Sequence, residues 1–251
     1  MNVIERILSD PETCSYLPDR EARLEFRLIL HVEPAIMDRF LVRGWRRFGF
    51  AYFRPACVGC EACVSLRIPV DSFRPSRAQV RARRASSRLR TAFDEPRVDE
   101  QRLALFRRWH ADRTDRRGWN HQPIDADRYE VEFAAPNPCA RELSWWDDEP
   151  PGADGPRLVG VGLVDETPSA FSAVYTYFDP EYGSASIGTS TVLALLDLAR
   201  ERGKRHVYLG YRVLGCASSE YKARFRPHEL ARGWPDLHEP PPVWSAGEPD
   251  R

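Results

Sequence analysis

Alternating apolar residues in the second half of the chain predict two strands that form a hairpin. The segments RLVGVGLVDE (157–166) and FSAVYTYF (171–178) both show the period of two that is typical of strands. The short segment TPSA between them is a turn. A third strand, HVYLGY (206–211), follows after a loop and a helix.

The helix before this third strand is the amphipathic segment TSTVLALLDLARERG (189–203). We expect Thr189 or Ser190 as its N-cap and Gly203 as its stop. The order strand, strand, loop, helix, strand is typical of the centre of an N-acetyltransferase fold, whose helix N-terminus offers free N–H groups to an anion. The sequence therefore predicts an α/β (α+β) protein. Its C-terminal half is an N-acetyltransferase-like (GNAT-like) mixed sheet flanked by helices, and its smaller N-terminal part contains the cysteines.

Patterns outside this segment divide the chain into three regions. A helix begins near Asp99 and carries Leu103, Leu105, Phe106 and Trp109 on roughly one side. The polar Pro/Gly segment 147–157 is a loop, and the tail from Trp234 is too proline-rich for regular structure, although Trp244 can dock back. We predict a cysteine-containing and basic N-terminal region (1–95), an acyltransferase domain (96–233) and a proline-rich tail (234–251).

Composition places the chain among globular proteins. It has 251 residues, of which 42% are hydrophobic and 11% aromatic, and it has no run of eighteen apolar residues that predicts a membrane-spanning helix. Its first residues include acidic ones and no apolar stretch of the kind found in secretory signals. We therefore expect a cytoplasmic protein with no membrane partner, in which the six cysteines are thiols or ligands rather than disulfides.

Net charge is zero, but positive charge is concentrated in one segment. Only two of the 37 basic residues are lysine, Lys204 and Lys222, and the segment RPSRAQVRARRASSRLR (74–90) carries seven arginines and no acidic residue. Like charges at this density repel one another unless an anion lies against them, and a polyphosphate chain is the obvious candidate. The alternative is a solvated basic helix whose compensating acids come from elsewhere in the fold.

Four blocks of sequence, taken in order, resemble a known family. They are TCSYLPDR (13–20), YFRPACVGCEACVSLRIPVDSFRPSRAQVRARR (52–84), YTYFDPEYGSASIGT (175–189) and VYLGYRVLGCASSEYKARFRP (207–227). Together they are similar to the bacterial aminoacyl-tRNA–protein transferases, the aspartate/glutamate leucyltransferases, which are relatives of the longer eukaryotic arginyl-tRNA–protein transferases. The chain departs from the family pattern at Ser15, Asp19, Ser218 and Ser219.

The resemblance implies a reaction in which the α-amine of a protein that begins with Asp or Glu attacks the aminoacyl ester at the tRNA 3′ end. Leucine or arginine is thereby joined to the acceptor, which marks it for degradation in an N-degron pathway. Positioning supplies much of the rate because the ester is already activated, and the transfer requires no cofactor. The expected partners are aminoacyl-tRNA and acceptor proteins, and no DNA partner is expected.

The matching blocks also nominate catalytic residues. We expect Lys222 and Arg224 to offer cationic donors to the terminal adenosine of the tRNA or to a substrate carboxylate, and we place Tyr221 beside them. We expect Asp179 either to orient the attacking amine or to cap the turn at Pro180.

Arginine and aromatic side chains are the predicted substrate-binding residues. Arginine suits the carboxylate of an N-terminal Asp or Glu because its guanidinium binds such a group bidentately. Tyr175 and Tyr177 share one face of their strand and are either pocket lining or plain core. The full set is Arg54, Arg67, Arg77, Tyr175, Tyr177, Tyr211 and Phe225. For the tRNA phosphates we predict Arg81, Arg83, Arg84 and Arg88, with contacts that weaken steeply as salt is added.

The cysteines raise a separate question about metal. Cys57, Cys60 and Cys63 follow one another at spacings of three, and Cys14 lies upstream. Four such thiols suit an iron–sulfur cluster and do not exclude tetrahedral zinc. The resemblance points the same way, because eukaryotic members of the family are reported to bind a cluster through N-terminal cysteines. The alternative is a set of structural or redox-sensitive thiols that pack as small apolar groups.

Two other classes of protein share part of this pattern. A non-catalytic cysteine-cluster module that binds RNA has the basic segment and the thiols, but it has no use for the blocks after residue 175. A coenzyme A-dependent N-acetyltransferase has the scaffold. Its pyrophosphate loop carries an arginine and paired glycines, however, and the segment GSASIGTS (183–190) lacks that pattern.

Overall fold

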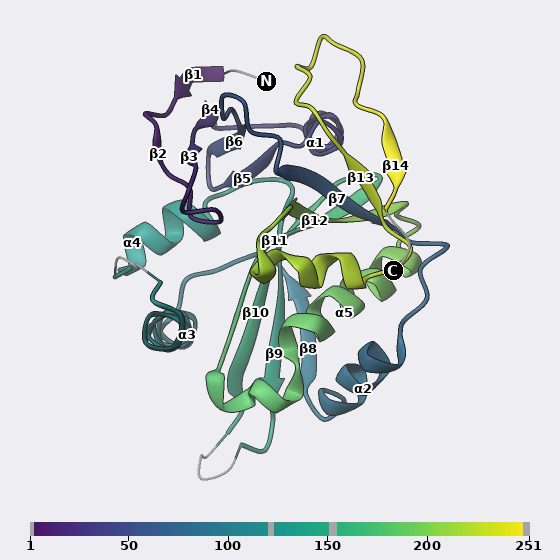
Figure 1. The fold of residues 1–251 in the computed structure, drawn as a ribbon. Helices are drawn as coiled ribbons and strands as arrows, with labels where there is room; N and C mark the ends of the chain where they lie inside the picture. The colour runs from purple at the N-terminus through teal and green to yellow at the C-terminus, as the bar shows by residue number, and fades with distance from the viewer. Residues whose placement is uncertain (1–2, 120–122, 151–154, 248–251) are drawn as a thin grey trace.

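The structure, a computed structural model, describes residues 3–119, 123–150 and 155–247. Its main feature is an eight-stranded mixed sheet (Figure 1). Neighbouring strands are antiparallel except for one parallel pair, β11 and β12. The order across the sheet is β14 (Trp244–Ala246), β13 (Glu229–Ala231), β7 (Cys63–Pro69), β12 (His206–Val213), β11 (Ala170–Phe178), β10 (Arg157–Glu166), β9 (Ala140–Asp147) and β8 (Arg90–Asp94).

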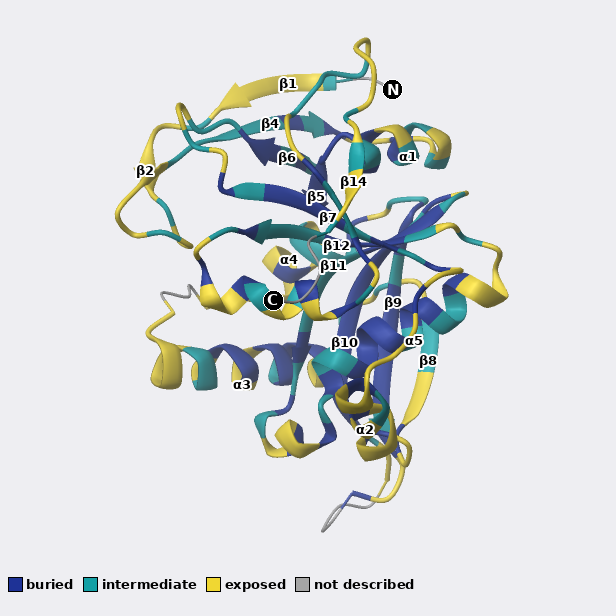
Figure 2. Cartoon of the chain, turned by 45° about the vertical axis from the view of Figure 1, so that its right-hand side comes forward, coloured by how far each residue is buried: buried dark blue, intermediate teal, exposed yellow. Residues whose placement is uncertain are grey.

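A smaller antiparallel sheet from the N-terminal third of the chain shares a core with the large one. Helix α1 (Pro34–Val42) packs into this core, which also takes in Ala170 and Tyr208 of the large sheet. Figure 2 shows β1 as the exposed edge of the small sheet, whereas β5 and β6 are largely buried. The strand order is β1 (Val3–Leu8), β4 (Leu24–Ile29), β6 (Ala51–Pro55) and β5 (Arg46–Phe48), and β2 (Glu12–Thr13) pairs with β3 (Glu21–Ala22) in a short ribbon.

Helices cover both faces of the large sheet, as Figure 1 shows. Helix α3 (Glu100–Arg117) packs its apolar side on Leu158 and Tyr177, in one core. Helices α5 (Ile187–Glu201) and α2 (Arg77–Ala85) lie over the other face, where Val159 belongs to a second core. Helix α4 (Ala126–Tyr129) and a π-helical turn (Glu130–Ala134) follow α3. These features confirm the predicted mixed sheet flanked by helices.

The predicted hairpin and helices are present, with one correction at a helix start. β10 and β11 form the hairpin, and Asp99 caps α3 by accepting a hydrogen bond from the backbone N–H of Arg102 at 2.9 Å. Helix α5 begins at Ile187, so the prediction of Thr189 or Ser190 as N-cap is wrong. The Ser190 hydroxyl instead hydrogen-bonds to the α2 segment, at the Ala82 carbonyl (3.2 Å) and the Ser86 hydroxyl (3.0 Å).

Two glycines in β10 let helix α5 approach the sheet closely. A Cβ atom on Gly160 would lie 2.8 Å from Ile187 Cγ2, and one on Gly162 would lie 2.6 Å from Thr191 Cγ2. Both distances are below any normal van der Waals contact, so the first turn of α5 sits where only glycine fits beneath it. The predicted stop at Gly203 is also present, just after the C-cap of the helix, with φ of +64°.

The predicted N-terminal region and the predicted tail both contribute strands to the large sheet. Strands β7 and β8 both precede residue 95 and lie in the same sheet as β10 to β12. The prediction that the tail lacks regular structure is wrong at β14, which pairs with β13. Trp244 does dock back: its indole N–H donates to the Val42 carbonyl at 3.2 Å, and its ring contacts Tyr208. Within the described residues, no helix has both the length and the apolar character needed to cross a membrane.

Candidate active site

The parallel pair β11 and β12 separates part-way along its length. Only Ala170–Ser172 pairs with His206–Tyr208, although both strands continue well beyond these residues. A cavity of about 300 Å³ opens where the pairing stops, lined by Ser172, Ala173 and Val174 from β11 and by Leu209, Gly210 and Tyr211 from β12. This volume is in the range of small-molecule sites.

The other walls of the cavity come from the N-terminal third of the chain. The segment between β2 and β3 contributes Cys14, Ser15 and Tyr16, and strand β5 contributes Arg46, Arg47 and Phe48. The cavity therefore lies between the two sheets, and side chains distant in sequence meet in it. The remaining lining residues are Glu12, Ala22, Leu24, Phe53, Pro55, Cys57, Cys63, Asp165 and Lys222.

Lys222 is the predicted catalytic residue that the structure places in this cavity. Its ammonium nitrogen donates to the Tyr211 carbonyl oxygen at 2.6 Å. Burial lowers the pKa of Lys222 to about 8, and the nearby positive charge of Arg46 acts in the same direction. Gly210, which lines the same cavity, has a φ of +74°, a backbone conformation that favours glycine.

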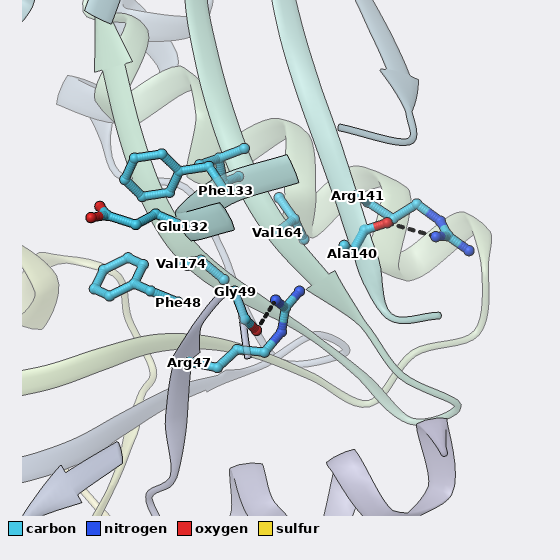
Figure 3. Close-up of a pocket in the computed structure, with 10 residues that line it drawn as sticks. Arg47, Phe48, Gly49, Glu132, Phe133, Ala140, Arg141, Val164 and Val174 are labelled. Atoms are coloured by element: carbon cyan, nitrogen blue, oxygen red, sulfur yellow. Dashed lines mark hydrogen bonds between the residues drawn. The ribbon is translucent and has the colours of Figure 1, made fainter. Parts of the chain in front are cut away.

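Arg47 and Asp165 form a buried ion pair in the wall of the same cavity. Burial raises the pKa of the Asp165 carboxyl, and the Arg47 guanidinium opposes this effect. Arg47 also donates to the Gly49 carbonyl at 3.1 Å and borders a second hollow, shown in Figure 3 with Phe48, Glu132 and Phe133. That hollow holds about 10 Å³, which is room for no more than about one water.

The predicted catalytic segment lies in a 3-10 turn, η3 (Ala217–Arg224). Ser219 fixes the start of this turn, because its hydroxyl accepts from the Val213 N–H at 3.0 Å and donates to the Val213 carbonyl at 2.9 Å. Tyr221 and Arg224 are exposed on the surface and do not line the cavity. Phe225 is buried and packs on Phe73, so it belongs to the core.

The basic segment lies directly beside η3. Ser76 and Gln79 form a capping box that starts α2, and the Gln79 side-chain amide also donates to the Arg224 carbonyl at 3.2 Å. The Arg74 N–H bonds to the Arg226 carbonyl at 3.4 Å. The arginine-rich helix is thus attached to the turn that carries Lys222.

The arginines of this segment fall into two groups. Arg83 pairs with Asp197 at 2.8 Å, Arg88 with Asp147 at 2.9 Å and Arg90 with Asp148 at 2.9 Å, so acids from elsewhere in the fold compensate these three charges. Arg77, Arg81 and Arg84 are exposed and have no carboxylate within 4.0 Å among the described residues. Their spacing of four and three puts them on one face of α2. This face carries the uncompensated positive charge.

Several predicted site residues lie outside the cavity. The hydroxyl of Tyr175 bonds to His110 Nε2 at 2.9 Å and that of Tyr177 bonds to Tyr129, so both tyrosines pack against the α3 side of the sheet as core. Asp179 caps the turn η2 (Pro180–Ala185) by accepting from the Glu181 N–H at 3.1 Å, and it pairs with Arg157 and Arg108. Of the two roles expected for Asp179, the structure shows the cap.

Arg54 and Arg67 are occupied by partners from the chain itself. Arg54 pairs with Glu25 at 2.7 Å and stacks on Trp45, and Arg67 pairs with Glu229 at 2.6 Å. Tyr211, by contrast, lines the cavity, with its hydroxyl donating to the Gly44 carbonyl at 2.6 Å.

The four thiols are neighbours but are held separately. Cys57 bonds to the backbone of Arg23, and Cys60 accepts from Arg20 at 3.5 Å. Burial, reinforced by the other three thiols, raises the pKa of Cys63 to about 12. Among the described residues, no three side chains of Cys, His, Asp or Glu converge as metal ligands. We route no step of the reaction through a metal.

Arg46 is one of the cavity residues that the sequence did not single out. In a chain where nearly every basic residue is arginine, the pair in GWRRFG (44–49) carries no distinguishing pattern. Its special position arises only because β5 is placed against β12 by the packing of two sheets, which no local signal encodes.

A mixed sheet that opens between two parallel strands, with a cation-lined cavity at the opening, is an arrangement of the N-acetyltransferase-like fold class. The chain belongs to the arginine-tRNA-protein transferase family, whose N-terminal model matches residues 12–81 and whose C-terminal model matches residues 101–232.

Two curated relatives and one solved structure illustrate the similarity. The chain is 38% identical to an aspartate/glutamate leucyltransferase of Halorhodospira halophila, over 88% of this chain and 92% of that one. It is 31% identical to an aspartate/glutamate leucyltransferase of Helicobacter hepaticus, over 97% and 98% of the two chains. The structure of L-PGS from Bacillus licheniformis is similar at 11% identity and a TM-score of 0.47, over 86% of this chain and 64% of that one.

Proposed function

We propose that this protein is an aminoacyl-tRNA–protein transferase that joins leucine from its tRNA to proteins whose N-terminal residue is Asp or Glu. The observation that carries the proposal is the position of η3. Lys222 lies in the cavity between the diverging strands, while the carbonyl of Arg224 is bonded to the basic helix α2. Family membership and the names of the relatives support the same reaction.

The proposed transfer makes one bond and breaks one. The neutral α-amine of the acceptor attacks the ester carbonyl, a C–N bond forms, and the bond between the carbonyl carbon and the ribose oxygen breaks. The oxyanion that develops needs a donor, and the leaving hydroxyl needs the proton that the amine releases.

Lys222 is placed to meet both of these demands. As an ammonium it has two N–H bonds beyond the one donated to Tyr211, and these can turn toward an oxyanion in the cavity. With a pKa of about 8 it exchanges a proton readily near neutral pH. The apolar walls formed by Phe48, Phe53 and Leu209 suit the leucyl side chain.

The exposed face of α2 is the proposed contact for the tRNA acceptor arm. Arg77, Arg81 and Arg84 have no acidic partner among the described residues, so their charge is available to backbone phosphates. Because α2 is bonded to η3, a tRNA on this helix would lie beside the turn that carries Lys222.

The decisive assay offers labelled leucyl-tRNA and arginyl-tRNA with peptides that begin with Asp, Glu or Ala. Leucine incorporated into the two acidic peptides and not into the Ala peptide supports the proposal. If arginine is incorporated instead of leucine, the proposed type of reaction holds and the transferred residue is arginine. No transfer from either tRNA contradicts the proposal and favours a protein that only binds RNA.

The biological setting belongs to the same proposal. Transfer from a tRNA requires the compartment that holds charged tRNA, so the enzyme is placed in the cytoplasm, where the tagged proteins enter an N-degron pathway. The reaction itself uses no cofactor. Binding of an iron–sulfur cluster or zinc by Cys14, Cys57, Cys60 and Cys63 stays a prediction, which metal analysis and a visible absorption spectrum of anaerobically purified protein test.

A further inference from the structure

Arg46 carries a buried positive charge that the protein does not neutralise. Its side chain lines the central cavity and the residue is only 7% exposed. No carboxylate among the described residues lies within 4.0 Å of its guanidinium. Its sequence neighbour Arg47, equally buried, is paired with Asp165. A buried charge without a counter-ion is costly, so its presence at an open cavity points to an anionic ligand.

One edge of the Arg46 guanidinium has no hydrogen-bond partner among the described residues. Nη1 donates to the carbonyl oxygens of Trp45 at 2.6 Å and Leu41 at 3.3 Å. Nε and Nη2 are buried and have no hydrogen-bond partner among the described residues. These two nitrogens form the side of the guanidinium that binds a carboxylate through two parallel hydrogen bonds. The backbone contacts therefore orient Arg46 and leave its carboxylate-binding edge without a hydrogen bond among the described residues.

Other polar groups that line the same cavity suit a carboxylate ligand as well. The Ser172 hydroxyl lines the cavity, is fully buried, and lacks a partner among the described residues, as does Arg47 Nε. The rings of Tyr208 and Tyr211 each lie 5.4 Å from the Arg46 guanidinium carbon and hold it in place by cation–π contact. Three side chains with unpartnered buried polar atoms thus line the same cavity.

The chemistry of the two substrates indicates which of them binds at Arg46. A leucyl ester offers an ammonium group and an aliphatic side chain, neither of which pairs with arginine. The phosphates of the tRNA are strongly hydrated and find exposed arginines on α2. An acceptor that begins with Asp or Glu carries a single small carboxylate on the same residue as its reacting amine, and this group suits a buried bidentate site.

We infer that Arg46 is the specificity-determining residue that binds the side-chain carboxylate of the acceptor's N-terminal Asp or Glu. This inference rests on the proposed function. Lys222 then stays available for the ester. Arg54 and Arg67 keep their own carboxylate partners and take no part in recognising the acceptor.

The test compares isosteric acceptors that differ only in charge. Values of kcat/KM are measured with leucyl-tRNA and peptides beginning with Asp or Asn, and with Glu or Gln, for wild type, Arg46→Gln, Arg46→Lys and Arg67→Gln. Losing two charge-assisted hydrogen bonds in Arg46→Gln should reduce kcat/KM for the acidic peptides about 100-fold and leave the amide peptides nearly unchanged. Arg46→Lys keeps the positive charge but lacks the forked guanidinium, so its kcat/KM for the acidic peptides should fall about 10-fold. Arg67→Gln should keep the preference of the wild type.

Direct binding separates this inference from the proposed transfer. Calorimetry measures the affinity of Asp-Ala and Asn-Ala dipeptides for wild type and Arg46→Lys without any tRNA. Tighter binding of Asp-Ala that Arg46→Lys weakens supports the carboxylate site even if no leucine is transferred. Equal affinities for the two dipeptides overturn it. An Arg46 variant that raises KM for leucyl-tRNA and retains the Asp over Asn preference also overturns it, and assigns the residue to RNA. If Arg46→Gln does not fold, Arg46→Lys and the wild-type binding data still decide.

Discussion

The ammonium nitrogen of Lys222 lies 2.6 Å from the carbonyl oxygen of Tyr211, so the turn η3 is joined to strand β12 at the point where the large sheet opens. The contact holds the lysine at the cavity wall and uses one of the three N–H bonds of its ammonium group. Neutralising or removing this side chain should therefore affect the chemical step more than the fold.

The pH dependence of Lys222 variants provides a first prediction. Burial lowers its pKa to about 8, so the ammonium is present at pH 7 and is lost as pH rises through 8. Lys222→Arg stays charged over this range. The ratio of wild-type to Lys222→Arg rates cancels the titration of the acceptor amine and should fall with an apparent pKa near 8. Single-turnover rates from pH 6 to 10 measure it, and a flat ratio contradicts a role for the charged form.

Removing the Lys222 side chain is a separate prediction. Lys222→Ala should lower kcat/KM about 100-fold, the size typical of losing one oxyanion donor or proton donor. The thermal unfolding midpoint should change little or rise, since a buried charge is removed along with one hydrogen bond. A variant that folds and transfers leucine at the wild-type rate excludes Lys222 from the reaction.

The two groups of arginines on the basic segment should behave differently. Changing both Arg81 and Arg84 to Gln removes exposed, unpaired charges, so tRNA affinity should fall and the slope of log K against log salt should decrease by about 2 units. Arg88→Gln is the matched control, because its charge is already paired with Asp147. Filter binding at 50 to 300 mM salt measures both, and equal slopes for the double variant and the control contradict the assignment of this face.

Close packing of α5 on β10 predicts a large effect from one methyl group. Gly162→Ala places a Cβ 2.6 Å from Thr191 Cγ2, and relieving this overlap should cost about 1–3 kcal/mol of unfolding free energy. Gly183→Ala is the control, because a Cβ there meets nothing within 4 Å. Urea unfolding of both variants measures the difference. Similar midpoints for the two variants contradict the close approach described here.

Asp236 should make stability sensitive to acid. Hydrogen bonds from Arg27 and from the Leu237 N–H hold the pKa of Asp236 below its usual range. Its contribution is therefore complete above about pH 4 and is lost as the pH falls toward the lower folded-state pKa. Asp236→Asn should lose about 1–3 kcal/mol at pH 7 and show a shallower fall in stability below pH 4. Denaturant titrations at pH 7, 4 and 3 measure both effects.

Local patterns predicted the elements well where the fold depends on neighbouring residues. The period of two between 157 and 178 specified the β10–β11 hairpin, and Asp99 and Gly203 marked helix ends. The start of α5 was misplaced because Ser190, a good capping type, is buried inside the helix and hydrogen-bonds to the α2 segment. A local preference was overridden by packing between distant segments.

The candidate site was only partly predictable, for the same reason. Lys222 and Tyr211 lie in one recognisable block and both reach the cavity. Tyr175 and Tyr177 have the right spacing for a shared face, but the sequence does not say that this face meets α3. Arg46 reaches the cavity only because the small sheet packs on the large one, a relationship between segments more than 100 residues apart.

The position of β7 has a consequence for any attempt to divide the molecule. This strand, from residues 63–69, separates β12 from β13, both of which come from the last quarter of the sequence. A fragment that starts at residue 96 would lack β7, so the edges of β12 and β13 that face it would have unpaired backbone groups. Such exposed edges pair with strands of other polypeptides. The halves are therefore complementary pieces of a single folding unit, and neither should be soluble unless the other is expressed with it.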